Sequence, residues 1–238
     1  MQESVPIVIR AGLQLLLLIL PVLLALNSGA DDTRKATSYD VAFDIDWTLF
    51  YPIEGHRDSQ TVVLPEGDFR MADGVIEAII ELHQQGHRIS IFSGGPKVRN
   101  HGLVEYMLKK IHEKGAADFS FYKVLNFEDL SEGQKDLTKI NEDLSRVVIV
   151  DDNRKFRMAG QERSFYLIEK TYRFHPEFQD GLSHEFDPPN KSEWRSERNK
   201  IPSFLRTFNK AQKYFSGPQF LPSLQKLRQG SSLCRKLL

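Results

Sequence analysis

The most informative part of the chain reads Val41-Ala42-Phe43-Asp44-Ile45-Asp46-Trp47-Thr48-Leu49, in which a short apolar run ends in two aspartates. An apolar run that stops at acidic residues is typical of a buried strand in a parallel sheet. The carboxylates then lie at the carboxyl end of the strand, where open α/β sheets bind their ligands. Asp44 and Asp46 are therefore candidates for a functional site.

The chain from Tyr39 onward alternates short apolar runs with helical patterns, which predicts an α/β, Rossmann-like fold with a parallel sheet and helices on both faces. The expected strands are 40–46, 88–93, about 118–124, 146–151 and about 164–168. The expected helices are 75–85, with Asp73 as N-cap and Gly86 just past the end, then 103–115, and about 135–144. Residues 51–72 predict a small β-hairpin flap and leave no room for a large cap domain.

Composition sets mild limits on the function. The 238 residues are 40% hydrophobic and carry 32 basic and 32 acidic side chains. This is enough for one full core and gives no general attraction to nucleic acid. Cys234 is the only cysteine. An internal disulfide framework and a cysteine-based zinc site are therefore excluded.

The N-terminus predicts a targeting segment. Residues 11–26 are apolar, follow Arg10 and precede small residues that suit a signal peptidase. Gln14 and Pro21 interrupt the run, which is shorter than the roughly 20 apolar residues of a spanning helix. We favour residues 1–30 as a cleaved signal peptide, which predicts an exported protein, periplasmic or secreted. An uncleaved single-pass membrane anchor is the alternative.

The domain boundaries follow from a change in composition. We expect the catalytic domain at residues 31–180 and a basic, loosely attached C-terminal arm at residues 181–238. The arm contains apolar residues at helical spacing between 204 and 215. This pattern favours an amphipathic helix that packs on the domain with its basic face in solvent. Contact with a membrane surface or a partner protein is the alternative.

The spacing of the paired aspartates suits a single shared ligand. Side chains at i and i+2 of a strand project to the same side, so Asp44 and Asp46 can serve one phosphoryl group. An ionised carboxylate is a suitable nucleophile for phosphorus. Because two carboxylates and a phosphate repel one another, a hard divalent cation such as magnesium is expected between them.

Three further segments carry side chains of the same chemistry. Ser93-Gly94-Gly95 ends the second expected strand, and its hydroxyl and backbone N–H groups suit phosphate oxygens at a helix N-terminus. Lys135 opens the segment Lys135-Asp136-Leu137-Thr138-Lys139 and offers a cation, and Lys139 and Lys123 are the alternatives. Asp151 and Asp152 follow the apolar run 147–150 and complete an acidic site.

The four segments, in this order, resemble the motifs of the haloacid dehalogenase superfamily, whose first motif is Asp-x-Asp-x-Thr. The pattern is most similar to the branch of RNA polymerase C-terminal-domain phosphatases and NLI-interacting-factor-like phosphatases, and it covers about residues 38–175. The resemblance implies that Asp44 is the nucleophile and Asp46 the general acid and base. Trp47 and the sequence Ser93-Gly94-Gly95 depart from the usual residues of this branch, which leaves the substrate open.

The resemblance also implies the remaining site residues. Ser93 and Lys135 would join Asp44 and Asp46 as catalytic residues. Thr48, Gly94 and Gly95 would bind the substrate. The resemblance implies a Mg²⁺ cofactor, and its ligands would be Asp44, Asp46, Asp152 and Asp151, with Asp152 bound directly.

The predicted function is an exported, magnesium-dependent phosphomonoester hydrolase that forms an aspartyl-phosphate intermediate. Without a large cap, the pocket should admit an exposed or macromolecular substrate such as a phosphoprotein. Two other functions remain open. Some membrane-anchored relatives of this branch act as non-catalytic receptors. In a phosphotransferase, the phosphoryl group of the phosphoaspartate passes to an alcohol instead of water.

Overall fold

A computed structural model describes residues 37–230 except 56 and 169. The predicted signal peptide at residues 1–30 and Cys234 lie outside the described residues.

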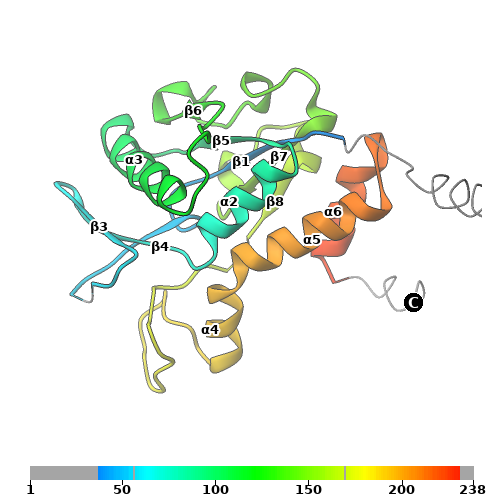
Figure 1. The fold of residues 1–238 in the computed structure, drawn as a ribbon. Coiled ribbons are helices and arrows are strands. Elements are labelled where there is room, and N and C mark those ends of the chain that lie inside the picture. The colour runs from blue at the N-terminus through cyan, green and yellow to red at the C-terminus, as the bar shows by residue number, and fades with distance from the viewer. Residues whose placement is uncertain (1–36, 56, 169, 231–238) are drawn as a thin grey trace, which may run out of the picture. The chain divides into compact units, whose positions relative to one another are not determined.

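A five-stranded parallel sheet forms the centre of the described residues, in the order β6-β5-β1-β7-β8 (Figure 1). This confirms the predicted α/β fold and the approximate positions of four strands, whereas the strand expected at about 118–124 is only two residues long and begins at Val124. The strands are β1 (Asp40–Phe43), β5 (Arg88–Phe92), β6 (Val124–Leu125), β7 (Val147–Asp151) and β8 (Phe165–Leu167). The side chains of the three central strands are almost entirely buried, as expected for a sheet covered on both faces.

The segment between β1 and the first helix folds into a small antiparallel sheet in the order β2-β4-β3. Its strands are β2 (Phe50–Pro52), β3 (Thr61–Leu64) and β4 (Gly67–Met71). The predicted flap is therefore present, with one strand more than a hairpin. Leu64 of this sheet lies so close to Gly102 of helix α3 (Lys97–Glu113) that a Cβ atom on Gly102 would collide with the Leu64 side chain.

Two α-helices cover one face of the sheet, α2 (Val75–Gln84) and α3 (Lys97–Glu113). Both bury apolar residues at helical spacing. Gly86 follows α2 with φ +83°, as predicted for a residue just past a helix end. The predicted N-cap at Asp73 is wrong. Gly74 occupies the cap position without a side-chain cap, because the Asp73 carboxylate pairs instead with Arg70 and Arg198.

The third predicted helix, about 135–144, is also wrong. This segment forms 3-10 turns at Leu137–Lys139 and Leu144–Arg146. The Asp136 and Asp143 side chains accept hydrogen bonds from backbone N–H groups two residues on, which competes with an α-helix. The apolar residues of the segment cover the second face of the sheet, packing with Ala42, Phe92 and Ile149.

The C-terminal segment forms three helices, α4 (Lys191–Arg198), α5 (Lys200–Tyr214) and α6 (Phe220–Arg228). Phe204, Phe208 and Phe220 are fully buried and belong to the same core as β1 and α2. The expectation of a loosely attached arm from residue 181 is therefore wrong for these helices, whose aromatic side chains complete the core. In Figure 1, α5 runs beside α2. The amphipathic helix expected between residues 204 and 215 is α5. It packs on the domain through its apolar face, and its basic residues within that range face solvent, as predicted.

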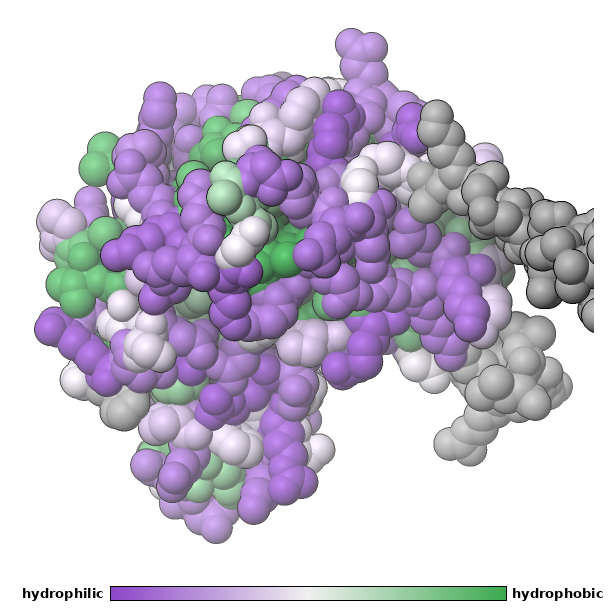
Figure 2. All heavy atoms as spheres, in the orientation of Figure 1, coloured by the Kyte–Doolittle hydropathy of each residue, from purple (hydrophilic) through white to green (hydrophobic). Residues whose placement is uncertain are grey.

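Short 3-10 turns make up the remaining helical structure of the described residues: Phe127–Asp129, Arg154–Phe156, Glu162–Ser164 and Gly217–Gln219. Among residues 37–230, no helix combines the length and apolar character needed to cross a bilayer. The face seen in Figure 2 is mostly hydrophilic, with apolar residues in small separate groups.

Replacing Phe204 with alanine tests whether the C-terminal helices belong to the core. The Phe204 ring packs edge-on against Phe43 and Tyr166. Phe204→Ala should therefore lower the free energy of unfolding by about 3–5 kcal/mol. Tyr214 is an exposed position of the same helix. Tyr214→Ala should change the free energy of unfolding by at most about 0.5 kcal/mol. Urea unfolding of both variants is the measurement, and equal small losses would contradict the packing described here.

Candidate active site

The register of the sheet brings three of the four motifs together. Phe43 pairs with Val150 on one side and Ile91 on the other. The Asp44 N–H continues this pattern and donates to the Val150 carbonyl at 2.9 Å. Asp44 therefore lies beside Asp151 of β7, and Ser93 follows the neighbouring strand at the same edge.

Lys135 completes the centre of the site. Its ammonium is fully buried and donates to Asp44 Oδ1 at 2.6 Å and Asp151 Oδ2 at 2.7 Å. The Lys135 backbone N–H donates to the Phe156 carbonyl at 2.7 Å, which ties this segment to the loop after β7. The two competing lysines point elsewhere: Lys123 and Lys139 donate to backbone carbonyls.

Three carboxylates are close enough to hold one cation. Asp44, Asp151 and Asp152 each place an oxygen within 4.8 Å of the others. Burial raises the pKa of Asp44 from 3.8 to about 8, and Lys135 partly opposes this rise. Burial, followed by the charge of Asp151, raises the pKa of Asp152 to about 7. Three acids beside a single ammonium lack positive charge, and their hard oxygen ligands fit a magnesium ion.

Asp46 lies outside this carboxylate group, although the sequence predicts it as a metal ligand. Its carboxylate, in a side chain that is 33% exposed, pairs with the Arg99 guanidinium at 2.5 Å. Arg99 comes from the first turn of α3 and was not predicted as a site residue. The only feature of the sequence that points to Arg99 is its position four residues after Gly95. Lys97, a basic residue two positions earlier, is placed in a similar way.

The glycine loop is shaped by close approach of other side chains. A Cβ atom on Gly94 would collide with the Phe156 ring, and one on Gly95 would collide with the Arg99 guanidinium. Ser93 is fully buried, and its Oγ accepts a hydrogen bond from the Gly95 N–H at 3.1 Å. The predicted phosphate loop is therefore packed directly between Phe156 and Arg99.

Thr48 lies inside the protein. Its side chain has no solvent exposure, and Oγ1 has no hydrogen-bond partner among the described residues. The hydroxyl is thus turned away from solvent, whereas the predicted role was substrate binding. The preceding residue, Trp47, has a left-handed backbone conformation with φ 58°.

Comparison with known proteins finds similar solved structures. No family model matches the chain, and no curated protein gives a significant match. One similar solved structure is a variant of the fission yeast RNA polymerase II CTD phosphatase Fcp1 bound to beryllium fluoride, with 16% identity and a TM-score of 0.43 over 85% of this chain. A second is Fcp1, described as an essential RNA polymerase II CTD phosphatase, with 17% identity and a TM-score of 0.43 over 85% of this chain.

The chain spans 64% and 63% of these two solved chains, which is under two thirds of their length.

The charge balance at Lys135 can be tested by unfolding. Lys135→Met leaves two buried carboxylates without their cation, so the free energy of unfolding should fall by about 3–5 kcal/mol at pH 8. At pH 5 the loss should be smaller, because Asp44, with a pKa of about 8, is already protonated there in both proteins and Lys135 then neutralises one charge fewer. Urea unfolding at both pH values measures the difference, and Lys139→Met serves as the surface control. An equal loss at the two pH values would contradict this account.

Proposed function

We propose that this protein is a phosphomonoester hydrolase of the haloacid dehalogenase type that works through an aspartyl-phosphate intermediate. The observation that carries the proposal is the buried Lys135 ammonium between Asp44 and Asp151, with the Asp152 carboxylate beside them. A nucleophilic carboxylate, a fixed cation and a set of metal ligands meet there at the carboxyl end of a parallel sheet.

The proposed reaction has two steps, the formation and the hydrolysis of the aspartyl-phosphate. First, with Asp46 protonated and Asp44 ionised, an Asp44 oxygen attacks phosphorus, the bond from phosphorus to the substrate oxygen breaks, and the departing oxygen takes the proton of Asp46. Second, a water molecule gives a proton to Asp46 and attacks phosphorus, which releases phosphate and restores the Asp44 carboxylate. Lys135 keeps Asp44 in place and offsets negative charge in both steps.

Asp44, Asp151 and Asp152 would hold the magnesium ion. When bound, the ion supplies positive charge between the nucleophile and the phosphoryl oxygens, which reduces their repulsion. The Arg99 guanidinium lies against Gly95 and pairs with the Asp46 carboxylate, so it links Asp46 to the loop that is proposed to bind phosphate.

The proposed substrate is an exposed phosphomonoester, such as a phosphorylated side chain of a protein. Two features support an accessible site: the insertion between β1 and α2 is only the small flap, and Asp46 and Asp152 remain partly exposed. Export to the periplasm or the medium is proposed from residues 1–30 alone.

Turnover of p-nitrophenyl phosphate tests the activity. The wild-type protein should release nitrophenol with Mg²⁺ and lose this activity in EDTA, and Asp44→Asn should reduce it to the background of the assay. Asp180→Asn, at an exposed position, should behave as the wild type.

Activity that survives Asp44→Asn or ignores the metal would contradict the mechanism. No turnover in any sample would favour the non-catalytic receptor. Transfer of phosphate to an added alcohol in preference to water would favour the phosphotransferase.

The pKa shifts predict how magnesium stabilises the fold. Asp44 and Asp152 have folded-state pKa values of about 8 and about 7, against 3.8 in the unfolded chain. Between these values the folded state binds more protons than the unfolded state, so metal-free protein should lose stability as pH rises from about 4 to about 8. Magnesium binds the deprotonated carboxylates of the folded state, so it should raise Tm more at pH 8 than at pH 5.

Thermal unfolding in EDTA and in Mg²⁺ at the two pH values is the measurement. Asp152→Asn should reduce the magnesium effect at pH 8. A rise in Tm that is the same at both pH values and in the variant would indicate binding elsewhere.

A further inference from the structure

A second buried ammonium group lies beside the turn that carries Asp46. Lys200, at the start of α5, has a side chain that is only 5% exposed. Its Nζ donates to the Trp47 carbonyl oxygen and, at 2.6 Å, to Glu197 Oε1. Burying an ammonium costs several kcal/mol unless its partners compensate. The sequence patterns assign Lys200 no role, and neither does the mechanism above.

The contact with Trp47 falls on a strained piece of backbone. Trp47 and Glu132 are the two non-glycine residues with positive φ in the described part of the chain. A left-handed conformation is unfavourable for a bulky residue and persists only where its surroundings hold it. Because Trp47 directly follows Asp46, this conformation helps to set where the Asp46 carboxylate lies.

Four contacts hold Trp47 in this conformation, and one of them is the edge-on approach of its ring to Tyr51, with centroids 6.1 Å apart. Its N–H donates to the Phe50 carbonyl at 2.8 Å, and its ring stacks on Phe186 with centroids 5.2 Å apart. Its carbonyl accepts from Lys200, which comes from 153 residues further along the chain. Of these contacts, the one from Lys200 is the charged one.

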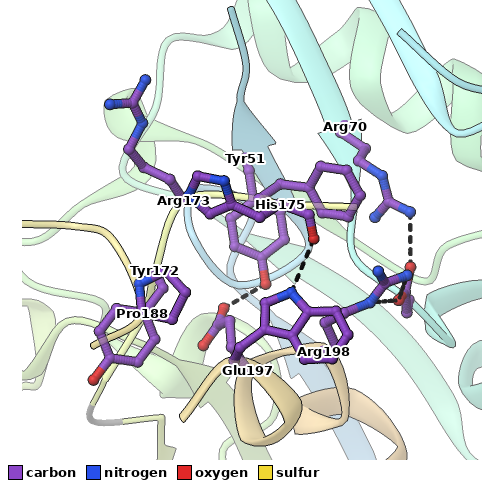
Figure 3. A pocket seen from close by; sticks show the side chains of 11 residues that line it. Tyr51, Arg70, Tyr172, Arg173, His175, Pro188, Glu197 and Arg198 are labelled. Carbon is purple, nitrogen blue, oxygen red and sulfur yellow. Dashed lines mark hydrogen bonds and ion pairs between the residues drawn. The ribbon is translucent and has the colours of Figure 1, made fainter. Parts of the chain in front are cut away.

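Lys200 is itself held firmly. Glu197 accepts hydrogen bonds from Lys200 and from the Tyr51 hydroxyl, and the second of these is drawn in Figure 3. The Lys200 Nζ also lies 4.3 Å from the centre of the Tyr51 ring, within the range of a cation–π contact. The ammonium is thus fixed by α4 and by the flap strand β2, not only by its own helix.

The charge of Lys200 also acts on the carboxylate group. Burial and Asp151 raise the pKa of Asp152, and Lys200 is the largest influence that lowers it. Burial lowers the pKa of Lys200, and Glu197, Asp152 and Asp44 oppose this. The acids of the site therefore interact with ammonium groups from two directions, Lys135 and Lys200.

We propose that Lys200 is a positioning residue of the active site, supplied by the C-terminal helices, which holds the Trp47 carbonyl and thereby orients Asp46. The inference rests on the proposed function. A salt bridge that only joined α4 to α5 would need no partner besides Glu197. Lys200 also contacts the Trp47 carbonyl, next to Asp46, and this second contact assigns it the further role.

Kinetics of Lys200→Met in the full chain test the proposal. The substitution keeps most of the length of the side chain and removes the ammonium. With p-nitrophenyl phosphate and Mg²⁺, kcat should fall by about 10²-fold while KM changes little, because misplacement of a catalytic group affects the chemical step. Lys213→Met, at an exposed position of the same helix, is the matched control and should keep the wild-type values.

Fluorescence separates a local change in the turn from loss of the fold. The chain has two tryptophans, so a Trp194→Phe background leaves Trp47 as the single reporter. Lys200→Met should shift the Trp47 emission of folded protein, and Lys213→Met should not. Lys200→Arg retains the charge and several donors, so its kcat and its Trp47 emission should be close to those of the wild type. This variant keeps the test decisive if Lys200→Met folds poorly.

The proposal is overturned if Lys200→Met retains kcat and the Trp47 emission of folded protein is unchanged. It is also overturned if kcat falls only in proportion to the unfolded fraction found by urea unfolding. If the wild-type protein shows no turnover, the proposed function fails, whereas the emission of Trp47 still decides whether Lys200 holds the turn.

Discussion

The buried ammonium of Lys135 is the contact on which the arrangement of the candidate site depends. It joins Asp44 on the carboxyl side of β1 to Asp151 on β7, two carboxylates that would repel each other if both were charged and left alone in a buried place. Lys135 comes from a segment without an α-helix, and its backbone contact with Phe156 sets its position. The loop after β7 therefore helps to fix both the lysine and one of its acids.

The sheet and the central acids were predictable from the sequence because both follow from local patterns. The apolar run that precedes Asp44 has to be buried, and the similar run before Asp151 has to lie in the same sheet. Once the two strands pair in parallel, their following residues meet at one edge. The role of Asp151 as a partner of Lys135 needed the register, which no local pattern supplies. The expected helix after Lys135 failed because Asp136 and Asp143 bind nearby N–H groups.

Arg99 and Lys200 could not be identified in the same way. Each lies on a helix rich in charged residues, where a basic side chain normally faces solvent. Their partners are 53 and 153 residues away in sequence, at Asp46 and Trp47. A helical pattern gives the buried face of a helix, but it does not say which backbone carbonyl or carboxylate lies opposite. The same limit explains why the C-terminal helices were expected to form a loose arm.

These long-range contacts give the first motif support from two sides. The sheet holds Asp44 through its neighbouring strands, while the C-terminal helices contact the residues around it: Phe204 packs on Phe43, Glu197 accepts from Tyr51, and Lys200 donates to the Trp47 carbonyl. Electrostatic catalysis requires charged groups that are already in place before the reaction, which costs folding free energy that other contacts must supply. In this protein the apolar core shared by the sheet and α5 is the largest set of such contacts. The boundary that composition suggested near residue 180 therefore divides the sequence at a place where the packing is continuous.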